Sequence, residues 1–248
     1  MRIKIIAPII TDQFNDSIKE EAERFTSSHA QIEVENITRG AASIESTYDE
    51  VLNAPAVVDA AVRAEKDGFD GVFVDCFGDP GVDAARECVN IPVVGGFQPA
   101  VLTARLLTDR FSIVTVLSNV VPIIRASIRR EGMDGNLASV RTVDMAVLDL
   151  TDPDALKETV GSEAETAVRE DGAEGIVLGC TGMLGLAEAV QERLADRGFA
   201  VPVVDPTGAA LGCLLNLHRN AISHSKRTYP PPPPKERNVE REVEGRDG

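Results

Sequence analysis

The stretch DGFDGVFVDCFGDPGVDAA at residues 67–85 recurs in related form as DGAEGIVLGCTGMLGLAEA at residues 171–189. A shift of 104 positions aligns the identical pairs Asp67/Asp171, Gly68/Gly172, Gly71/Gly175, Cys76/Cys180, Gly78/Gly182, Gly81/Gly185 and Ala85/Ala189. In both copies an apolar run ends at a cysteine, and a turn containing glycine leads into a helical pattern. Each copy therefore predicts a strand, a loop and a helix, with a thiol where the strand ends.

The rest of the chain extends this repeat into two α/β halves. The predicted strands are 3–7, 32–37, 71–75, 91–95, 111–117, 139–144, 175–179 and 201–205. The predicted helices lie near 15–28, 55–66, 81–89, 121–131, 153–170, 185–196 and 207–220. Strands rich in valine and isoleucine that alternate with helices predict parallel sheets covered on both faces. We therefore expect two pseudo-symmetric α/β lobes, each a four-stranded, mostly parallel sheet flanked by helices, with a site in the cleft between them.

The repeat also predicts how the chain divides. Lobe one is expected to comprise residues 1–97 plus about 207–224, because the turn around Gly208 allows the last helix to return to it. Lobe two is expected to comprise residues 98–206. Five consecutive prolines at 230–234 and an almost entirely charged or small run after them predict a disordered tail over 225–248, with a short polyproline II segment. A ligand for a proline-recognition domain is the less favoured interpretation of that tail.

Composition excludes several classes of partner. The chain has 248 residues and a formal net charge of −15, so nucleic acid and anionic membranes would repel it. No stretch approaches the roughly 20 apolar residues of a membrane span, and the start MRIKIIAPII is too short for a signal peptide. We therefore expect a cytoplasmic protein. The acidic surface suits a salty cytoplasm, although an ordinary acidic bacterial protein explains it equally well.

Four cysteines occur without a CxxC pair, at positions 76, 88, 180 and 213, which favours free thiols over disulfides. The three histidines are not grouped with them at metal-ligand spacing, so we expect no metal site. Cys88 and Cys213 lack the context of the repeat and are interpreted as packing residues buried within helices.

The repeated cysteines stand where an open α/β sheet binds its ligands, beyond the carboxyl ends of the strands. Asp79 is expected to cap a helix that begins at Pro80, with free backbone N–H groups facing Cys76. Such a helix end lowers the pKa of a thiol and favours an anionic intermediate. Thr181 and Gly182 are expected to do the same for Cys180.

These motifs resemble those of a known family. VDCFGDPGVDAARE at 74–87, PVVG at 92–95, FSIVTVLSNVVPII at 111–124 and GCTGM at 179–183 resemble the hydantoin racemase branch of the aspartate/glutamate racemase superfamily. The resemblance covers roughly residues 1–220 and leaves out the tail. It supports the return of the last helix to lobe one, and it implies that the protein works without a metal or an organic cofactor.

The resemblance implies a racemase in which Cys76 and Cys180 form an acid–base pair. One thiolate takes the proton from the stereocentre of a 5-substituted hydantoin or a related ring such as allantoin, and the other thiol donates to the opposite face. Two such groups on opposite faces are what inversion by proton transfer requires. The residues expected to contact the small-molecule substrate are Phe77, Gly78, Asp79, Thr115, Thr181 and Gly182. A homo-oligomer is also consistent with the resemblance.

The sequence departs from the family pattern in the expected pocket. The turn after the first strand is Ala7-Pro8-Ile9-Ile10-Thr11 and lacks the family's two asparagines, and the central strand has Thr115-Val116 in place of paired threonines. Phe77 stands where amino-acid racemases have asparagine or threonine, which disfavours free glutamate. These departures predict a pocket with few polar groups.

Three alternatives remain open. An amino-acid racemase, or a decarboxylase or isomerase of the same superfamily, would share the fold. Decarboxylases of the superfamily keep only one of the two cysteines, and isomerases use one cysteine as a nucleophile. A bilobed binding protein without catalysis is the remaining alternative, and the presence of both thiols disfavours it.

Overall fold

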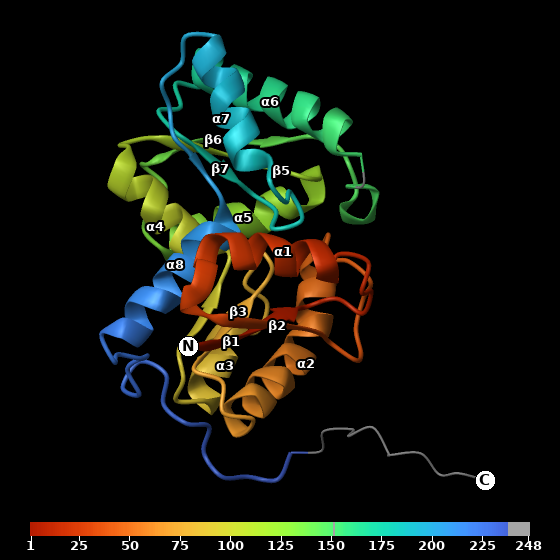
Figure 1. The fold of residues 1–248 in the computed structure, drawn as a ribbon, viewed down its shortest axis with the longest axis vertical. Coiled ribbons are helices and arrows are strands. Elements are labelled where there is room, and N and C mark those ends of the chain that lie inside the picture. The colour runs from red at the N-terminus through yellow and green to blue at the C-terminus, as the bar shows by residue number, and fades with distance from the viewer. Residues whose placement is uncertain (151, 238–248) are drawn as a thin grey trace, which may run out of the picture.

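The computed structural model describes residues 1–150 and 152–237, which form two lobes stacked one above the other (Figure 1). Each lobe contains a four-stranded parallel sheet, with strand orders β2-β1-β3-β4 and β6-β5-β7-β8. The strands of lobe one are β1 (Arg2–Ala7), β2 (Gln31–Asn36), β3 (Gly71–Val74) and β4 (Val93–Gly95). The strands of lobe two are β5 (Phe111–Thr115), β6 (Leu137–Thr142), β7 (Ile176–Leu178) and β8 (Val203–Val204). The predicted fold class of two α/β lobes is confirmed.

Helices cover both faces of each sheet. They are α1 (Asn15–Thr26), α2 (Thr47–Lys66), α3 (Val82–Cys88), α4 (Phe97–Leu107), α5 (Val121–Arg130), α6 (Pro153–Glu170), α7 (Leu186–Asp196) and α8 (Pro206–Arg219). Within the described ranges, none of them is both long enough and apolar enough to cross a membrane.

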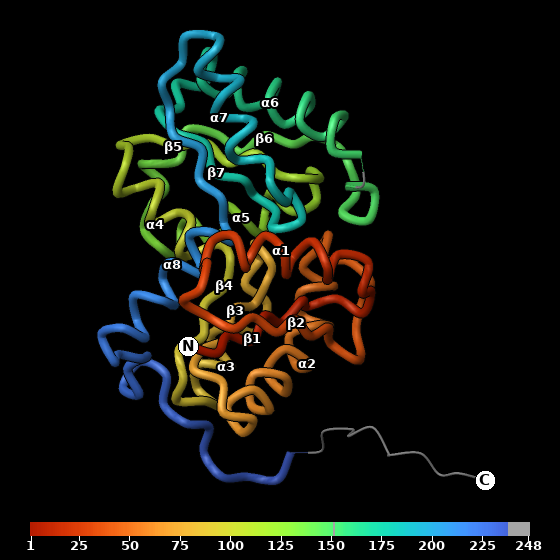
Figure 2. Tube along the Cα trace, viewed as in Figure 1, coloured from red at the N-terminus to blue at the C-terminus, as the bar shows by residue number. Residues whose placement is uncertain are grey.

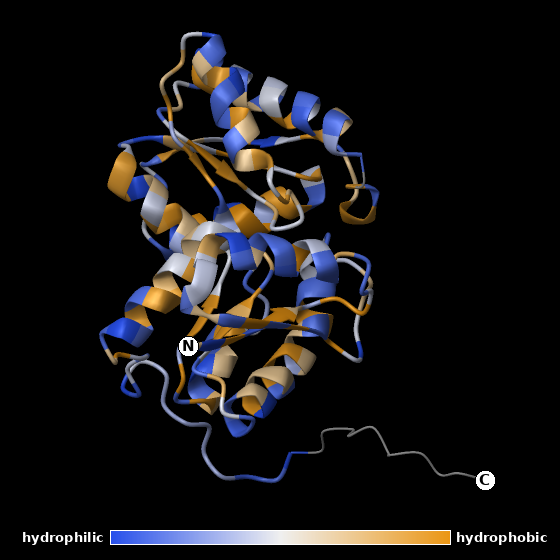
Figure 3. Cartoon of the chain, in the orientation of Figure 1, coloured by the Kyte–Doolittle hydropathy of each residue, from blue (hydrophilic) through white to orange (hydrophobic). Residues whose placement is uncertain are grey.

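The central strands form the core because both of their faces are covered. β3 and β5 are buried along their whole length, as the continuous apolar runs of parallel strands predict. Figure 3 shows this pattern as apolar strands inside each lobe and helices whose polar residues face outward. The apolar clusters on the two faces of the first sheet involve α2 and α3 on one side and α1 and α8 on the other.

The return of α8 to lobe one follows from its apolar face. Ala210, Leu211 and Leu214 are buried in the cluster that also contains residues of β1 and α1. The tube in Figure 2 shows the chain descending from lobe two into α8 beside the first sheet. The last helix of the second half therefore completes the core of the first.

Helix α4 was absent from the sequence prediction, which placed no helix between residues 95 and 111. Its buried residues Phe97, Ala100, Val101 and Ala104 join the core cluster of lobe two. Gly95, Gly96 and Pro99 favour a loop locally, but proline is tolerated in the first turn of a helix. Tertiary burial of the apolar face therefore decides this helix.

Helix α2 begins at Thr47 rather than near 55. Ser46 caps it, since its hydroxyl accepts a hydrogen bond from the Asp49 backbone N–H at 3.2 Å and donates to the Asp49 carboxylate at 2.7 Å. Pro55, which favours a helix start at that position, lies inside the helix instead. This early start brings Glu50 to the cleft between the lobes.

Residues 225–229, which the sequence assigned to the tail, contact lobe one instead. The Lys226 Nζ atom donates to the Arg86 carbonyl at 2.7 Å, and Arg86 Nη1 donates to the Tyr229 hydroxyl at 3.1 Å. His224, just before them, accepts a hydrogen bond from the Val93 N–H at 2.9 Å. These contacts need partners far away in the sequence. The predicted disorder over 238–248 lies outside the described residues, and the polyproline II segment stays a prediction.

Candidate active site

A cavity between the lobes is lined by residues of both. It contains about 800 Å³ of empty space, including its open mouth. Most of its wall is apolar, including Pro8, Ile9, Phe14, Ile44, Val116, Ile123, Ile124 and Val147. The turn after β1, which lacks the two asparagines of the family that the sequence resembles, forms part of this wall. The cavity therefore has few polar groups, as the sequence predicts.

Cys76 and Cys180 line this same cavity, and both are partly exposed free thiols. Each follows the carboxyl end of the third strand of its sheet by two residues, since β3 ends at Val74 and β7 at Leu178. Because the carboxyl ends of parallel strands face the cleft, the repeat of the sequence becomes a pair of thiols around one cavity.

The loop after Cys76 brings a backbone N–H group to the sulfur. The Gly78 N–H donates to Cys76 Sγ at 3.4 Å, while the Cys76 carbonyl accepts from the N–H groups of Asp79 at 3.3 Å and Gly96 at 3.2 Å. The Asp79 N–H is therefore engaged in the turn, and the expected contact of Asp79 with substrate stays a prediction. Phe77 is 5% exposed and packs edge-on against Phe97, with ring centroids 5.3 Å apart.

The loop after Cys180 is built in the same way. A Cβ atom placed on Gly182 would lie 3.4 Å from Cys180 Sγ, and the nearby backbone N–H groups of Gly182 and Met183 lower the pKa of that thiol. The Met183 N–H donates to the Cys180 carbonyl at 3.2 Å. Backbone amides of both loops therefore lie close to the thiols.

The thiols are nevertheless harder to ionise than the sequence predicted. Burial raises the pKa of Cys180 to about 12, ahead of the opposing amide hydrogen bonds. Burial also raises the pKa of Cys76 well above its ordinary value, and a negative charge on Cys180 or Glu50 would raise it further. The expectation of a lowered thiol pKa is therefore wrong, because desolvation of the thiolate outweighs the effect of the nearby amides.

Asp79 does not cap the helix that follows it. Its carboxylate accepts from the N–H groups of Phe97 at 2.9 Å and Gln98 at 3.4 Å, so it caps α4. The helix α3 begins at Val82 after Gly81, whose φ of 72° is left-handed. Asp79 itself has φ of 54°, a conformation that aspartate tolerates better than most residues. The residue was expected to contact substrate, but it fastens the Cys76 loop to a helix of the lobe-two core.

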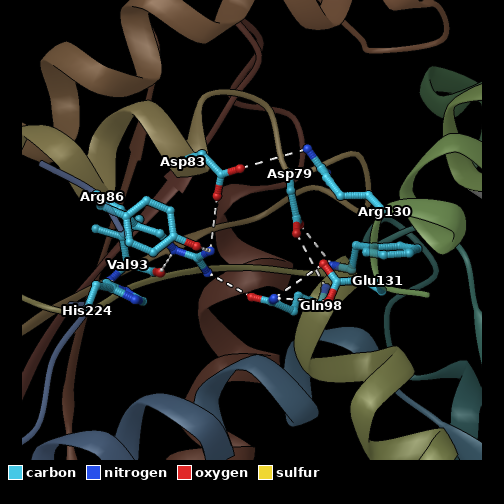
Figure 4. Close-up of polar contacts among 10 residues, drawn as sticks. Asp79, Asp83, Arg86, Val93, Gln98, Arg130, Glu131 and His224 are labelled. Carbon is cyan, nitrogen blue, oxygen red and sulfur yellow. Dashed lines mark hydrogen bonds and ion pairs between the residues drawn. The ribbon is translucent and has the colours of Figure 1, made fainter. Parts of the chain in front are cut away.

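A polar network surrounds this link (Figure 4). The buried Arg86 side chain donates to Asp83 and Gln98, each at 3.1 Å, and to the Val93 carbonyl at 3.0 Å. The Gln98 amide in turn donates to Glu131 at 3.3 Å. The network joins α3, α4 and the chain after α5 behind the Cys76 loop.

The two threonines expected to bind substrate line the cavity, but their hydroxyl protons are engaged. Thr115 donates to the Gly179 carbonyl at 2.9 Å and Thr181 donates to the Asp75 carbonyl at 3.1 Å. The first bond joins β5 to the residue before Cys180, and the second joins the residue after Cys180 to the residue before Cys76. Both hydroxyls therefore hold the site together and keep only acceptor capacity for a ligand.

Two acidic residues of the cavity wall escaped the sequence analysis. Glu50 comes from α2, whose start was misplaced, and nothing in its surroundings marks it. Asp75 directly precedes Cys76 and is 7% exposed, and burial raises its pKa to about 7. The sequence did contain a signal for Asp75, because the equivalent residue in the second copy of the repeat is Gly179, and the two copies therefore differ directly before the cysteine.

The remaining cysteines lie away from the cavity. Cys213 is partly buried in α8, whereas Cys88 at the end of α3 is exposed, so its interpretation as a buried packing residue is wrong. In the part of the chain that the structure describes, no three histidine, cysteine, aspartate or glutamate side chains are grouped to hold a metal ion. The expected absence of a metal stays a prediction.

Comparison with known proteins shows the family to which the chain belongs. The model of the Asp/Glu/Hydantoin racemase family matches residues 3–214. A hydantoin racemase from Pseudomonas sp. (strain NS671) is 39% identical over 206 residues, which cover 83% of this chain and 81% of that protein. An allantoin racemase from Klebsiella pneumoniae superposes with a TM-score of 0.90 at 32% identity, over 97% of both chains.

A second allantoin racemase structure, from Pseudomonas fluorescens, has a TM-score of 0.88 and 38% identity over 95% of this chain and 99% of that one. Arylmalonate decarboxylase, at 19% identity and a TM-score of 0.62, shares the fold. The chain therefore belongs to the Asp/Glu/Hydantoin racemase family, and it is an enzyme of the racemase class.

Proposed function

We propose that this member of the racemase family inverts the stereocentre of a 5-substituted hydantoin or a related ring such as allantoin, with Cys76 and Cys180 as the opposed acid and base. The observation that carries the proposal is the position of the two thiols at equivalent points of the two lobes, where both line one cavity. The relatives named hydantoin racemase and allantoin racemase support a ring substrate.

The proposed reaction moves one proton off the substrate and one proton on. The thiolate of one cysteine takes the proton from C5 of the ring, and the electron pair of the C–H bond delocalises onto the adjacent carbonyl as an enolate. The thiol of the other cysteine then donates its proton to the opposite face of C5. The first cysteine is now a thiol and the second a thiolate, so the enzyme is ready for the other enantiomer.

The raised pKa values fit a pair that loses a single proton. A negative charge on Cys180 raises the pKa of Cys76, so ionisation of one thiol opposes ionisation of the other. The singly charged pair is one base and one acid, which is the state that the reaction needs. The amides of Gly78 and Gly182 would stabilise whichever sulfur holds the charge.

The cavity wall favours a neutral ring over a free amino acid. None of its described lining residues is a lysine, arginine or histidine, whereas Glu50 and Asp75 are acidic. A substrate carboxylate would lack a cationic partner there, which argues against the amino-acid racemase and decarboxylase alternatives.

The test is solvent exchange at C5 combined with loss of optical rotation. The full chain is incubated in D₂O with one enantiomer of a 5-alkyl hydantoin, and in parallel with one enantiomer of allantoin. We expect deuterium incorporation and loss of rotation well above two controls, the uncatalysed reaction and the double variant Cys76→Ser, Cys180→Ser. Exchange at the rate of the controls with both rings would contradict the proposal.

A further inference from the structure

Glu50 contributes a carboxylate to the cavity wall next to the Cys76 loop. It accepts no hydrogen bond and forms no ion pair within residues 1–150 and 152–237, although its side chain is about half buried. The neighbouring polar groups are already engaged, since the Thr115 and Thr181 hydroxyls donate to backbone carbonyls. The Glu50 carboxylate therefore keeps its lone pairs available at the cavity wall, where a bound ligand with an N–H group can donate to it.

The position of Glu50 places this acceptor beside the first thiol. A Cβ atom placed on Gly78 would lie 3.4 Å from Glu50 Oε1, and the Gly78 N–H is the group that donates to Cys76 Sγ. A negative charge on Glu50 raises the pKa of Cys76, as expected for neighbouring groups. Glu50 therefore reaches the part of the cavity where an atom in contact with Cys76 would lie.

Lobe two offers no equivalent carboxylate. The shift of 104 positions relates Glu50 to Asp154 at the start of α6, which is exposed and lies outside this cavity. The Cys180 thiol has acidic neighbours from lobe one instead, since Asp75 and Glu45 raise its pKa, but the Glu45 carboxylate already accepts a hydrogen bond from the Val147 N–H.

We propose that Glu50 is a specificity-determining residue that accepts a hydrogen bond from a substrate N–H group close to the stereocentre and disfavours an anionic group at that position. The inference rests on the proposed function, because it takes the stereocentre to lie between Cys76 and Cys180. A hydantoin ring presents an N–H bonded directly to C5, and a ureido substituent presents another. A hydantoin with a carboxylate on its substituent places a negative charge there instead.

Burial strengthens the discrimination. Desolvation raises the pKa of Glu50, while the positive charge of Arg130 opposes that rise. Once ionised, a carboxylate in a largely apolar cavity repels a second negative charge with little screening by solvent. The same carboxylate forms a stronger hydrogen bond with an N–H group than a neutral acceptor does.

The test varies the charge at position 50 of the enzyme and the charge on the substrate, and it compares all combinations of the two. The two substrates are hydantoins with a 5-carbamoylmethyl or a 5-carboxymethyl group, which have nearly the same shape and differ in charge. The enzymes are the wild type, Glu50→Gln, Glu50→Ala and the control Glu20→Gln, which removes an exposed carboxylate on α1. The measured quantity is kcat/KM for C5 deuterium exchange with each substrate.

We expect the wild type to prefer the amide over the acid by about tenfold to a hundredfold. The ratio should fall to within about threefold of unity in Glu50→Gln and Glu50→Ala, because kcat/KM for the acid rises as that for the amide falls. Glu20→Gln should keep the wild-type ratio. A preference that persists in both Glu50 variants, or a wild type that accepts both substrates equally, would overturn the inference. Because these outcomes require an active wild type, they differ from failure of the proposed function, in which the wild type exchanges neither substrate.

Discussion

The loops around Cys76 and Cys180 have the same backbone plan and different side chains. In both, the cysteine follows the third strand of its sheet, a glycine stands two residues later, and a left-handed glycine precedes the next helix, with φ of 72° at Gly81 and 71° at Gly185. The side chains that support the two thiols are nevertheless unequal. Where the first loop has Asp75, Phe77 and Asp79, the second has Gly179, Thr181 and Met183.

The difference shows what the repeat conserves. It places two sulfurs at equivalent points of one cavity, and it leaves the means of holding each loop free to vary. Asp79 fastens the first loop to α4 through a carboxylate, whereas Met183 is buried in the apolar core of lobe two. A racemase tolerates this inequality because two enantiomers have the same free energy in solution. The value of kcat/KM must then be equal in the two directions, while kcat and KM need not be.

The largest expected effect comes from removing one thiol at a time. Cys76→Ala and Cys180→Ala should each lower the rate of racemisation by at least about a hundredfold, because inversion needs a group on each face. The remaining thiol can still remove and return a proton on its own face. Each variant should therefore exchange C5 deuterium in one enantiomer with retention of configuration, and the two variants should act on opposite enantiomers.

Chiral chromatography with mass detection measures both outcomes. A single variant that racemises at the wild-type rate would exclude a two-base mechanism. If both variants exchanged the same enantiomer, the thiols would not lie on opposite faces of the substrate.

The next effect is on stability and concerns Gly179, which directly precedes Cys180 and is the counterpart of Asp75 in the first half. A Cβ atom on Gly179 would meet Ile113 Cγ2 at 2.6 Å and Thr115 Cβ at 2.8 Å, so the second half cannot carry the counterpart of Asp75. Gly179→Ala should reduce the free energy of unfolding by about 1–3 kcal/mol. Urea denaturation of the variant measures the change.

Gly212→Ala in α8 is the matched control. A Cβ atom there meets nothing within 4 Å, and alanine should increase stability by up to about 1 kcal/mol. Equal stability of the two alanine variants would contradict the packing argument at Gly179.

The hydrogen bond between Asp79 and α4 occurs only in the first loop, so its removal tests the comparison of the two loops in a third way. Asp79→Ala should cost about 1–2 kcal/mol of unfolding free energy, because α4 loses its cap and alanine is strained at φ of 54°. It should also lower kcat, since the loop that holds Gly78 against Cys76 Sγ loses its attachment.

Asp79→Asn should restore most of the loss, because an asparagine oxygen can still accept from the Phe97 N–H and asparagine tolerates that backbone conformation. In the other loop Met183→Leu conserves volume and should cost less than about 1.5 kcal/mol. If the asparagine variant were as inactive as the alanine variant, the carboxylate would have a role beyond positioning.

The last effect concerns the contact between the halves and appears only as the pH is raised. Glu21 on α1 accepts the Gly185 N–H of lobe two at 2.6 Å, and its other carboxyl oxygen is buried without a partner. Burial, helped by the nearby Asp205 and Asp75, raises the pKa of Glu21 from 4.5 to about 8, while the Gly185 N–H and Arg24 oppose this rise. The folded protein thus holds a proton that the unfolded chain releases, so unfolding free energy should fall as pH rises from 4.5 through about 8.

Glu21→Gln replaces the titratable carboxyl group with a neutral amide, so this proton no longer affects the unfolding free energy. The variant should match the wild type at about pH 5 and exceed it by about 1–3 kcal/mol at about pH 8. Urea denaturation at several pH values measures the difference, with Glu20→Gln as a control expected to follow the wild type. If the unfolding free energies of the wild type and Glu21→Gln changed with pH in the same way, a group other than Glu21 would hold the proton.

Much of the fold could be predicted because its signals are local. The apolar runs of β1, β3, β5 and β7 and the duplicated cysteine motif indicate strands whichever partners they find. The helix α4 could not be predicted, since Gly96 and Pro99 favour a loop locally. Its apolar face gains its stabilisation from distant residues in the core of lobe two.

The site divides in the same way. Cys76 and Cys180 stand out because the chain repeats them, so the sequence placed both at one cleft. Glu50 carries no local signal, and its position in the cavity depends on where α2 begins. Asp79 was assigned to the wrong helix because the cap of α3 is a local inference, whereas its contact with α4 crosses 18 residues.

By itself, the sequence determined that this protein has two duplicated α/β halves with a thiol at the same strand end in each, because apolar periodicity and repetition are properties of neighbouring residues. Only the tertiary structure decided which polar groups surround those thiols and how readily they ionise. The reason is physical, since the pKa of a thiol depends on burial and on nearby charges such as Glu50 and Asp75 that fold into contact from distant segments.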